Sequence, residues 1–223
     1  MGRYLKLFLG IILSAFGIAL VVQADLGAFP KTCLNIGLAN CTGFSLGFAS
    51  FLVEALILIF NFSFKEKIGM GTLLNAFLSG YILDFYLTYL PIAANIVTGI
   101  IMIVIGMIIQ SLGYYLITDC ALGNTATNGF MMIIHKKTNT SILTIRTIEE
   151  TVFAVVGFIM GGPIGFATVL LSITFGSVMS FTYKLVKFNP DNVKHQFISL
   201  SMIRGVLNGR VCNNIYHRKG GKR

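Results

Sequence analysis

Apolar runs long enough to cross a lipid bilayer alternate along this chain with short polar segments. A span needs roughly 17–25 mostly apolar residues, so we predict six transmembrane helices. They cover residues 4–23, 46–62, 69–90, 96–118, 141–160 and 164–187. Pro91 ends the third run, and the turn Gly161-Gly162-Pro163 separates the last two. The pattern predicts an all-α polytopic membrane protein, with residues 1–187 forming a single membrane domain.

The composition agrees with this fold class. The chain is 55% hydrophobic and 11% charged, with a mean hydropathy of +0.82. Soluble domains carry about 25% charged residues. A soluble chain this apolar would expose large patches and aggregate, which excludes that class.

The first run has one competing interpretation. Residues 7–22, followed by Val22-Gln23-Ala24, imitate a signal peptide with a small-residue cleavage site. The run is long for the apolar part of such a peptide, and a similar run at 96–118 lies in mid-chain. We therefore interpret residues 4–23 as a transmembrane helix.

A polar stretch after the first span recurs after the fourth. Gln23-Ala-Asp-Leu-Gly-Ala-Phe-Pro30 is followed 96 residues later by Asp119-Cys-Ala-Leu-Gly-Asn-Thr-Ala126. At the same offset, without a gap, five glycines meet five glycines and Glu54 meets Glu150. We interpret this as a duplication, with repeat one at about 5–91 and repeat two at about 96–187. Two unrelated apolar stretches are the alternative.

The number of spans in each copy decides their relative orientation. Three spans are an odd number, so the two copies must enter the membrane from opposite sides and form an inverted repeat. This architecture is common in secondary transporters. The polar breaks, at 28–40 and 124–136, are expected as half-helices on opposite faces, either re-entrant or on the surface. If their N-termini point inward, they offer N–H groups and positive dipole ends to an anionic group.

The net charge of +9 is a topology signal. Basic residues cluster at the ends of the apolar runs, which is not the pattern of a nucleic-acid surface, so no nucleic-acid partner is expected. With a cytoplasmic N-terminus, the inner segments hold Arg3, Lys6, Lys65, Lys67, Lys136, Lys137 and the basic tail 188–223, and the outer ones hold Lys31. We expect a multi-pass protein of the bacterial cytoplasmic membrane with both termini inside. The tail is expected to be a short amphipathic helix or disordered.

Ionisable residues inside spans are functional candidates because burying a charge in lipid is costly. Glu54 and Glu150 occupy equivalent positions and suit cation or proton coupling. The alternative is structural pairing, which is strongest for Glu150 because Arg146 lies one helical turn before it. Arg146 is also a candidate clamp for a carboxylate of the solute.

Each of the other polar residues in or near the spans has two possible roles. Asp84 either contributes to a solute path or reaches interfacial water, and Asp25 and Asp119 flank the breaks and are candidate caps of the half-helices. Candidates for a polar path or for hydrogen bonds between helices are Asn35, Asn75, Asn124, Thr125 and Asn128.

Nothing in the chain predicts a cofactor, a metal site or an enzyme. Cys33, Cys41, Cys120 and Cys212 have no metal-ligand spacing with histidine. We weigh a Cys33–Cys41 disulfide against simple packing of small apolar residues and favour packing. We find no nucleophile elbow, no HExxH motif and no phosphate-binding loop.

The break and several later motifs resemble a family. Ala24-Asp-Leu-Gly-Ala-Phe-Pro30 is similar to the A-x-LG-x-x-P-W-D signature of the YczE/YyaS/YitT group of bacterial membrane proteins. The stretches that fit the same pattern are Gly37-Leu38-Ala39, Thr42-Gly43-x-Ser45-x-Gly47, Gly69-x-Gly71-Thr72-x-x-Asn75 and Gly80-x-x-x-Asp84. The similarity covers about residues 5–195. It implies an inner-membrane protein and little about the substrate. Lys31-Thr32 stand where Trp-Asp would follow, so any role of that acidic residue is in doubt here.

These observations favour a transporter of a small polar or anionic solute, with Glu54 as the candidate for proton coupling. The alternative is a non-transporting accessory protein of an export or biosynthetic complex. A six-span bundle of 223 residues is small for alternating access, so a homodimer is a further expectation.

Overall fold

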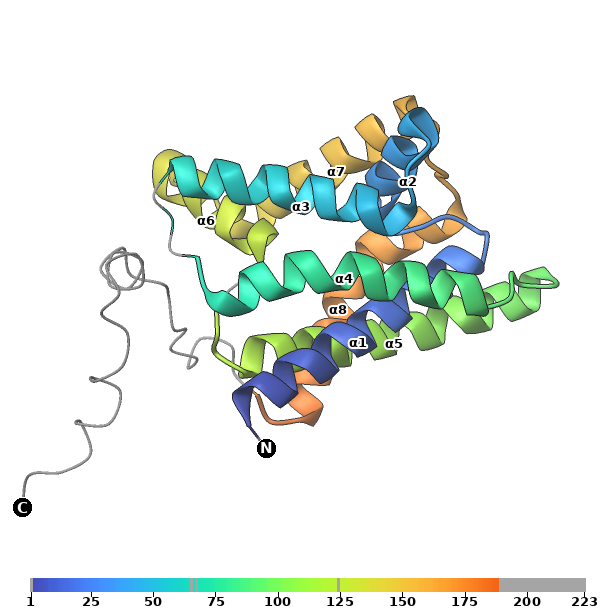
Figure 1. The fold of residues 1–223 in the computed structure, drawn as a ribbon, viewed down its shortest axis with the longest axis horizontal. Helices are drawn as coiled ribbons and strands as arrows, with labels where there is room; N and C mark the ends of the chain where they lie inside the picture. Colours follow the sequence, from blue (N-terminus) through green and yellow to red (C-terminus); the bar gives the residue numbers. More distant parts are fainter. Residues whose placement is uncertain (1, 65, 67, 124, 189–223) are drawn as a thin grey trace, which may run out of the picture.

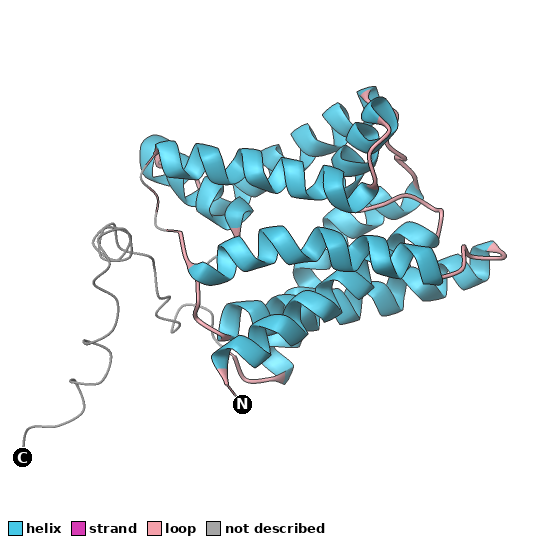
Figure 2. Ribbon diagram, in the orientation of Figure 1, coloured by secondary structure: helices cyan, strands magenta, loops and turns pink. Residues whose placement is uncertain are grey.

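The computed structural model describes residues 2–188 except 65, 67 and 124. All regular structure in this part of the chain is helical (Figure 2). The helices are α1 (Arg3–Gln23), α2 (Pro30–Thr42), α3 (Leu46–Ser63), α4 (Met70–Tyr89), α5 (Ile96–Asp119), α6 (Ala126–Thr138), α7 (Ile142–Ile159) and α8 (Phe166–Leu185). The predicted all-α class is confirmed. The expectation for the tail beyond residue 188 lies outside the described residues.

Every predicted span corresponds to one helix, with ends displaced by no more than two residues. The breaks also contain helices, α2 and α6, each starting two residues later than predicted. Pro30 occupies the first turn of α2, where its missing N–H costs nothing. Four of the described helices, α1, α3, α5 and α8, are long and apolar enough to cross a membrane.

The 96-residue periodicity of the sequence is also a periodicity of the helices. The bounds of α2, α3 and α4 recur at that offset as the bounds of α6, α7 and α8. Left-handed backbone recurs as well. Asp25 and Ala121 have φ values of 54° and 58°, and Gly27 and Gly123 have φ values of 115° and 131°.

The helices form two layers (Figure 1). One contains α1, α4, α5 and α8, and the other contains α2, α3, α6 and α7. The buried apolar clusters lie mostly in the first layer, where α1 and α5 share the most extensive contact. The layers meet where α3 packs on α4, whereas α7 and α8 barely touch. This difference between equivalent helix pairs makes the molecule asymmetric.

Glycines let α1 and α5 approach backbone to backbone. A Cβ on Gly17 would lie 2.6 Å from the carbonyl oxygen of Gly106, and a Cβ on Gly10 would lie 2.9 Å from that of Gly113. Small residues at such crossings are typical of helix pairs in membranes. The two contacts are also reciprocal, because a shift of 96 residues exchanges Gly10 for Gly106 and Gly17 for Gly113.

The Leu-Gly pairs after α1 and α5 attach the breaks to distant helices. The carbonyl of Leu26 accepts from the backbone N–H of Ala167 at 3.0 Å, and that of Leu122 accepts from Gly71 at 2.9 Å. A Cβ on Gly27 would lie 2.7 Å from the Thr168 hydroxyl. These contacts satisfy N–H groups at the starts of α8 and α4, which would otherwise be unpaired.

Candidate functional site: a central cavity between the layers

A cavity of about 170 Å³ lies between the two layers, and all eight helices contribute to its lining. The first turns of α2 and α6 both border it, through Lys31 and Thr127 among others. Each helix N-terminus carries about half a positive charge. Both half-helices therefore place a positive dipole end beside the cavity.

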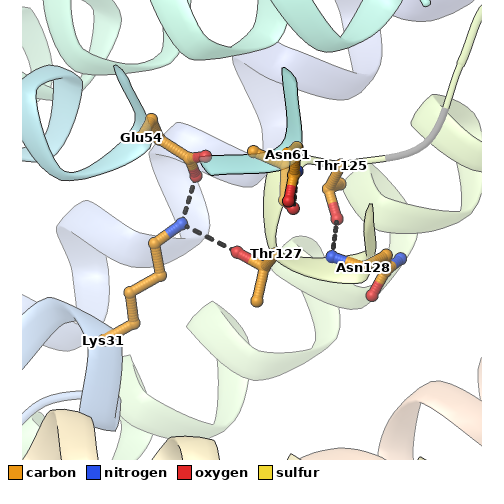
Figure 3. Close-up of polar contacts among 7 residues, drawn as sticks. Lys31, Glu54, Asn61, Thr125, Thr127 and Asn128 are labelled. Atoms are coloured by element: carbon orange, nitrogen blue, oxygen red, sulfur yellow. Dashed lines mark hydrogen bonds and ion pairs between the residues drawn. The ribbon is translucent and has the colours of Figure 1, made fainter. Parts of the chain in front are cut away.

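Lys31 forms the central polar contact (Figure 3). Its ammonium donates to Oε1 of Glu54 and, at 3.3 Å, to the hydroxyl of Thr127. Glu54 is only 6% exposed. We expected Lys31 in an outer segment, and the first turn of α2 places its side chain in the cavity lining. No local sequence signal distinguishes this lysine from one in a polar loop.

A second ion pair lies on α7. Nε of Arg146 donates to Oε1 of Glu150 at 3.0 Å, which confirms the pair expected one helical turn apart. Glu149, the neighbouring residue, also lines the cavity and is 7% exposed. The sequence analysis did not select Glu149. Its spacing of three residues from Arg146, on the same helix face, is the signal that would have found it.

Four buried side chains of the lining carry an oxygen without a hydrogen-bond partner among the described residues. These oxygens are Oδ1 of Asn35, Oε2 of Glu54, Oε1 of Gln110 and Oε1 of Glu149. Buried polar atoms in proteins are nearly always hydrogen-bonded, so a group of unpaired acceptors calls for an explanation. The lining also contains three glutamates against Lys31 and Arg146.

Most of the residues predicted for a solute path lie in the cavity lining. These are Asn35, Glu54, Asn75, Thr125, Asn128, Arg146 and Glu150. Asn124 lies outside the described residues. Asp25, Asp84 and Asp119 are not part of the lining.

The three aspartates have other positions. Asp119 forms an ion pair with Lys6 where the end of α5 meets the start of α1. Oδ1 of Asp84 accepts from the backbone N–H of Gly47 at 2.6 Å, at the start of α3. Asp25 lies in the loop before α2. Phe29 and Thr125 occupy the N-cap positions of the half-helices, and only Thr125 makes a side-chain cap hydrogen bond. The prediction that Asp25 and Asp119 cap them is therefore wrong.

Helices α3 and α4 are tightly packed, whereas the equivalent helices α7 and α8 are separated. A Cβ on Gly80 would lie 2.3 Å from the carbonyl oxygen of Gly47. A Cβ on Gly176, which is 96 residues after Gly80, would meet no atom within 4 Å. A hollow of about 650 Å³ lies there instead. It shares Arg146 and Glu150 with the central cavity, so the two spaces adjoin.

Cys33, Cys41 and Cys120 are free, so the structure has no Cys33–Cys41 disulfide. Cys33 is buried, as the packing interpretation predicts, whereas Cys41 is exposed. Cys212 lies outside the described residues. The Cys120 thiol donates to the carbonyl of Ile117 at 2.9 Å, and burial raises its pKa, so it stays protonated. The described part of the chain contains no group of three or more histidine, cysteine, aspartate or glutamate residues that could hold a metal ion.

Comparisons with known proteins relate this chain to uncharacterized proteins, one of which is named as a membrane protein. Residues 1–184 match the model of a family of unknown function, DUF6198. An uncharacterized protein of Haemophilus influenzae is 31% identical over 80% of this chain and 83% of its own length. The uncharacterized membrane protein YczE of Bacillus subtilis is 30% identical over 81% and 85%, and YyaS of the same organism is 28% identical over 79% and 90%. No solved structure matches the chain.

Proposed function

This chain belongs to the YczE/YyaS family of membrane proteins, matched as DUF6198, and we propose that it is a secondary transporter of a small polar solute. The solute binds in the central cavity. The proposal rests on a polar, charged cavity between the two helix layers. The layers pack together at α3 and α4, whereas a hollow separates α7 from α8. Binding sites of secondary transporters typically lie at the interface between inverted repeats.

The proposed topology has six spans in two inverted three-helix repeats, with α2 and α6 as re-entrant half-helices. The reciprocal contacts of Gly10 with Gly113 and of Gly17 with Gly106 support it, because a two-fold axis exchanges such contacts. Charge supports it too. Once Lys31 is assigned to the cavity, the proposed outer loops at 24–29, 43–45, 90–95 and 160–165 contain no lysine or arginine. Both termini are then cytoplasmic, in the inner membrane.

In this topology the structure corresponds to an inward-open state. The start of α3 and the end of α4 lie toward the outer face, where Gly47 and Gly80 are in close contact. The start of α7 and the end of α8 lie toward the cytoplasm, where the hollow beside Gly176 is found. Alternating access follows if the two repeats exchange conformations, so that the α3–α4 contact opens while the α7–α8 contact closes.

The cavity favours a polar solute over a simple anion, because its glutamates outnumber its basic residues by one. We assign proton coupling to the partly buried Lys31–Glu54 pair, since loss of the Glu54 charge would release Lys31 from its ion pair. The proposal assigns no chemical reaction, metal or cofactor to the cavity.

The test is solute binding and flux with the purified full chain in liposomes, over a panel of small metabolites. We expect at least one solute to be taken up, and we expect Glu54→Gln to reduce that uptake at least tenfold. The matched control is Glu66→Gln, because Glu66 pairs with the exposed Lys136 and does not line the cavity. Absence of binding and flux, together with a stable co-purifying protein complex, would favour the accessory role instead.

A further inference from the structure

We propose that the transported solute carries a protonated amine and that Glu149 binds it. This inference rests on the transport function proposed above and names the chemical class of its substrate. It depends on three features of the cavity, namely its unpaired acceptors, the pairing of its charges, and its size and lining.

The fully buried side-chain atoms of the lining that lack a hydrogen-bond partner among the described residues are all oxygens. They belong to Glu149, Gln110, Asn35 and Glu54, and each of these residues is less than 8% exposed. A ligand that satisfies them must donate several hydrogen bonds. An ammonium group has three N–H donors and no acceptor, so it can satisfy up to three of these four oxygens. A carboxylate or a phosphate has the opposite chemistry and would leave these oxygens unpaired.

One of the three glutamates that line the cavity takes part in no ion pair. Lys31 pairs with Glu54, and Arg146 pairs with Glu150. Glu149 takes part in no ion pair of the described chain. Two cations are thus shared among three carboxylates, and a cationic ligand would supply the missing positive charge. The equivalent residue in the first half is Val53, so this acidic group is present on one side of the cavity only.

The size and lining of the cavity indicate an organic amine. Its volume of about 170 Å³ is close to that of a cavity of about 150 Å³ that holds benzene, so a solute on the order of six to ten non-hydrogen atoms fits. Aromatic rings that line it are Phe29, Tyr114, Phe153, Phe175 and Tyr183. Such rings attract ammonium groups through their faces and contact the carbon part of a solute.

The hollow between α7 and α8 adjoins the cavity that Glu149 lines. The hollow between α7 and α8 reaches Arg146 and Glu150, the residues one helical turn before Glu149 and next to it. Arg146 also offers a guanidinium for an anionic group on the same solute, so zwitterions are compatible with the site. The amine remains the required group, because Glu149 and the neutral acceptors need a donor.

The experiment measures binding of matched compounds to the purified full chain in nanodiscs by isothermal calorimetry. The probes are butylamine and 4-aminobutyrate, with butyrate and butanol as counterparts without the amine. We expect both amines to bind and both counterparts to fail. Glu149→Gln should weaken amine binding at least tenfold, whereas Glu66→Gln, outside the cavity, should leave it unchanged. Gln110→Leu, which removes a neutral acceptor, should weaken it several-fold and serves if Glu149→Gln does not fold.

Each other outcome has a distinct meaning. If butyrate or butanol binds as well as the amines, or if amine binding survives Glu149→Gln, the inference is overturned while transport still stands. If Glu149→Gln removes only the pH dependence of uptake, Glu149 carries a proton and the inference also fails. If no solute of any class binds or crosses the membrane in liposomes, both this inference and the proposed transport function are rejected.

Discussion

The ammonium of Lys31 lies 3.3 Å from the hydroxyl of Thr127, the residue 96 positions later. Equivalent positions of the two halves thus contact each other at the centre of the molecule, where the first turns of α2 and α6 meet the cavity. Only one of these positions carries a charge. Lys31 and its partner Glu54 therefore make the centre asymmetric, and several predictions concern that asymmetry.

Removal of Lys31 should destabilise the protein strongly. Lys31→Met leaves Glu54 buried without its counter-charge, at a cost of about 3–5 kcal/mol. The double variant Lys31→Met/Glu54→Leu should recover most of that loss because it removes both charges. Thermal unfolding in detergent measures both effects. The control is Lys136→Met, which breaks a pair whose lysine is exposed and should cost less than about 1 kcal/mol. Equal losses in the two single variants would show that the Lys31 pair is not buried.

Two aligned glycines should respond differently to the same substitution. Gly80→Ala places a methyl group against the Gly47 backbone, so α3 and α4 must separate. Gly176→Ala adds a methyl group to open space. We expect Gly80→Ala to raise the labelling rate of a cysteine at Ser50, in the cavity, by an impermeant maleimide added outside the cell. The rate should rise several-fold, and Gly176→Ala should leave it unchanged. Similar rates in the two variants would argue against a closed outer contact.

The glycine of the first Leu-Gly pair should be less tolerant than another glycine with positive φ. Gly27→Ala adds both left-handed strain and a clash with Thr168, whereas Gly43→Ala, with a φ of 75°, adds strain in open space. We expect a loss of about 1 kcal/mol at Gly43 and about 2–4 kcal/mol at Gly27 when overpacking is included. Unfolding in denaturant measures the difference. Equal losses would mean that the loop moves freely away from α8.

Features with a local or periodic signal were predictable from the sequence. The long helices follow from the length of the apolar runs, and the Arg146–Glu150 pair follows from a spacing of one helical turn. The ion pair of Lys31 was not predictable, because its partner Glu54 is 23 positions away on another helix. The contrast between Gly80 and Gly176 was not predictable either. The two glycines align in the sequence, and only the packing of the helices around them separates their environments.

The central claim is that the two halves face opposite sides of the membrane around one cavity. It is tested most directly by labelling Thr42→Cys and Thr138→Cys, which are exposed at the ends of α2 and α6 and lie 96 residues apart. The background replaces Cys33, Cys41, Cys120 and Cys212 with serine. In intact cells, an impermeant maleimide should label Thr42→Cys, and it should label Thr138→Cys only after the membrane is permeabilised. Labelling of both from the same side would contradict the inverted repeat and the transport mechanism built on it.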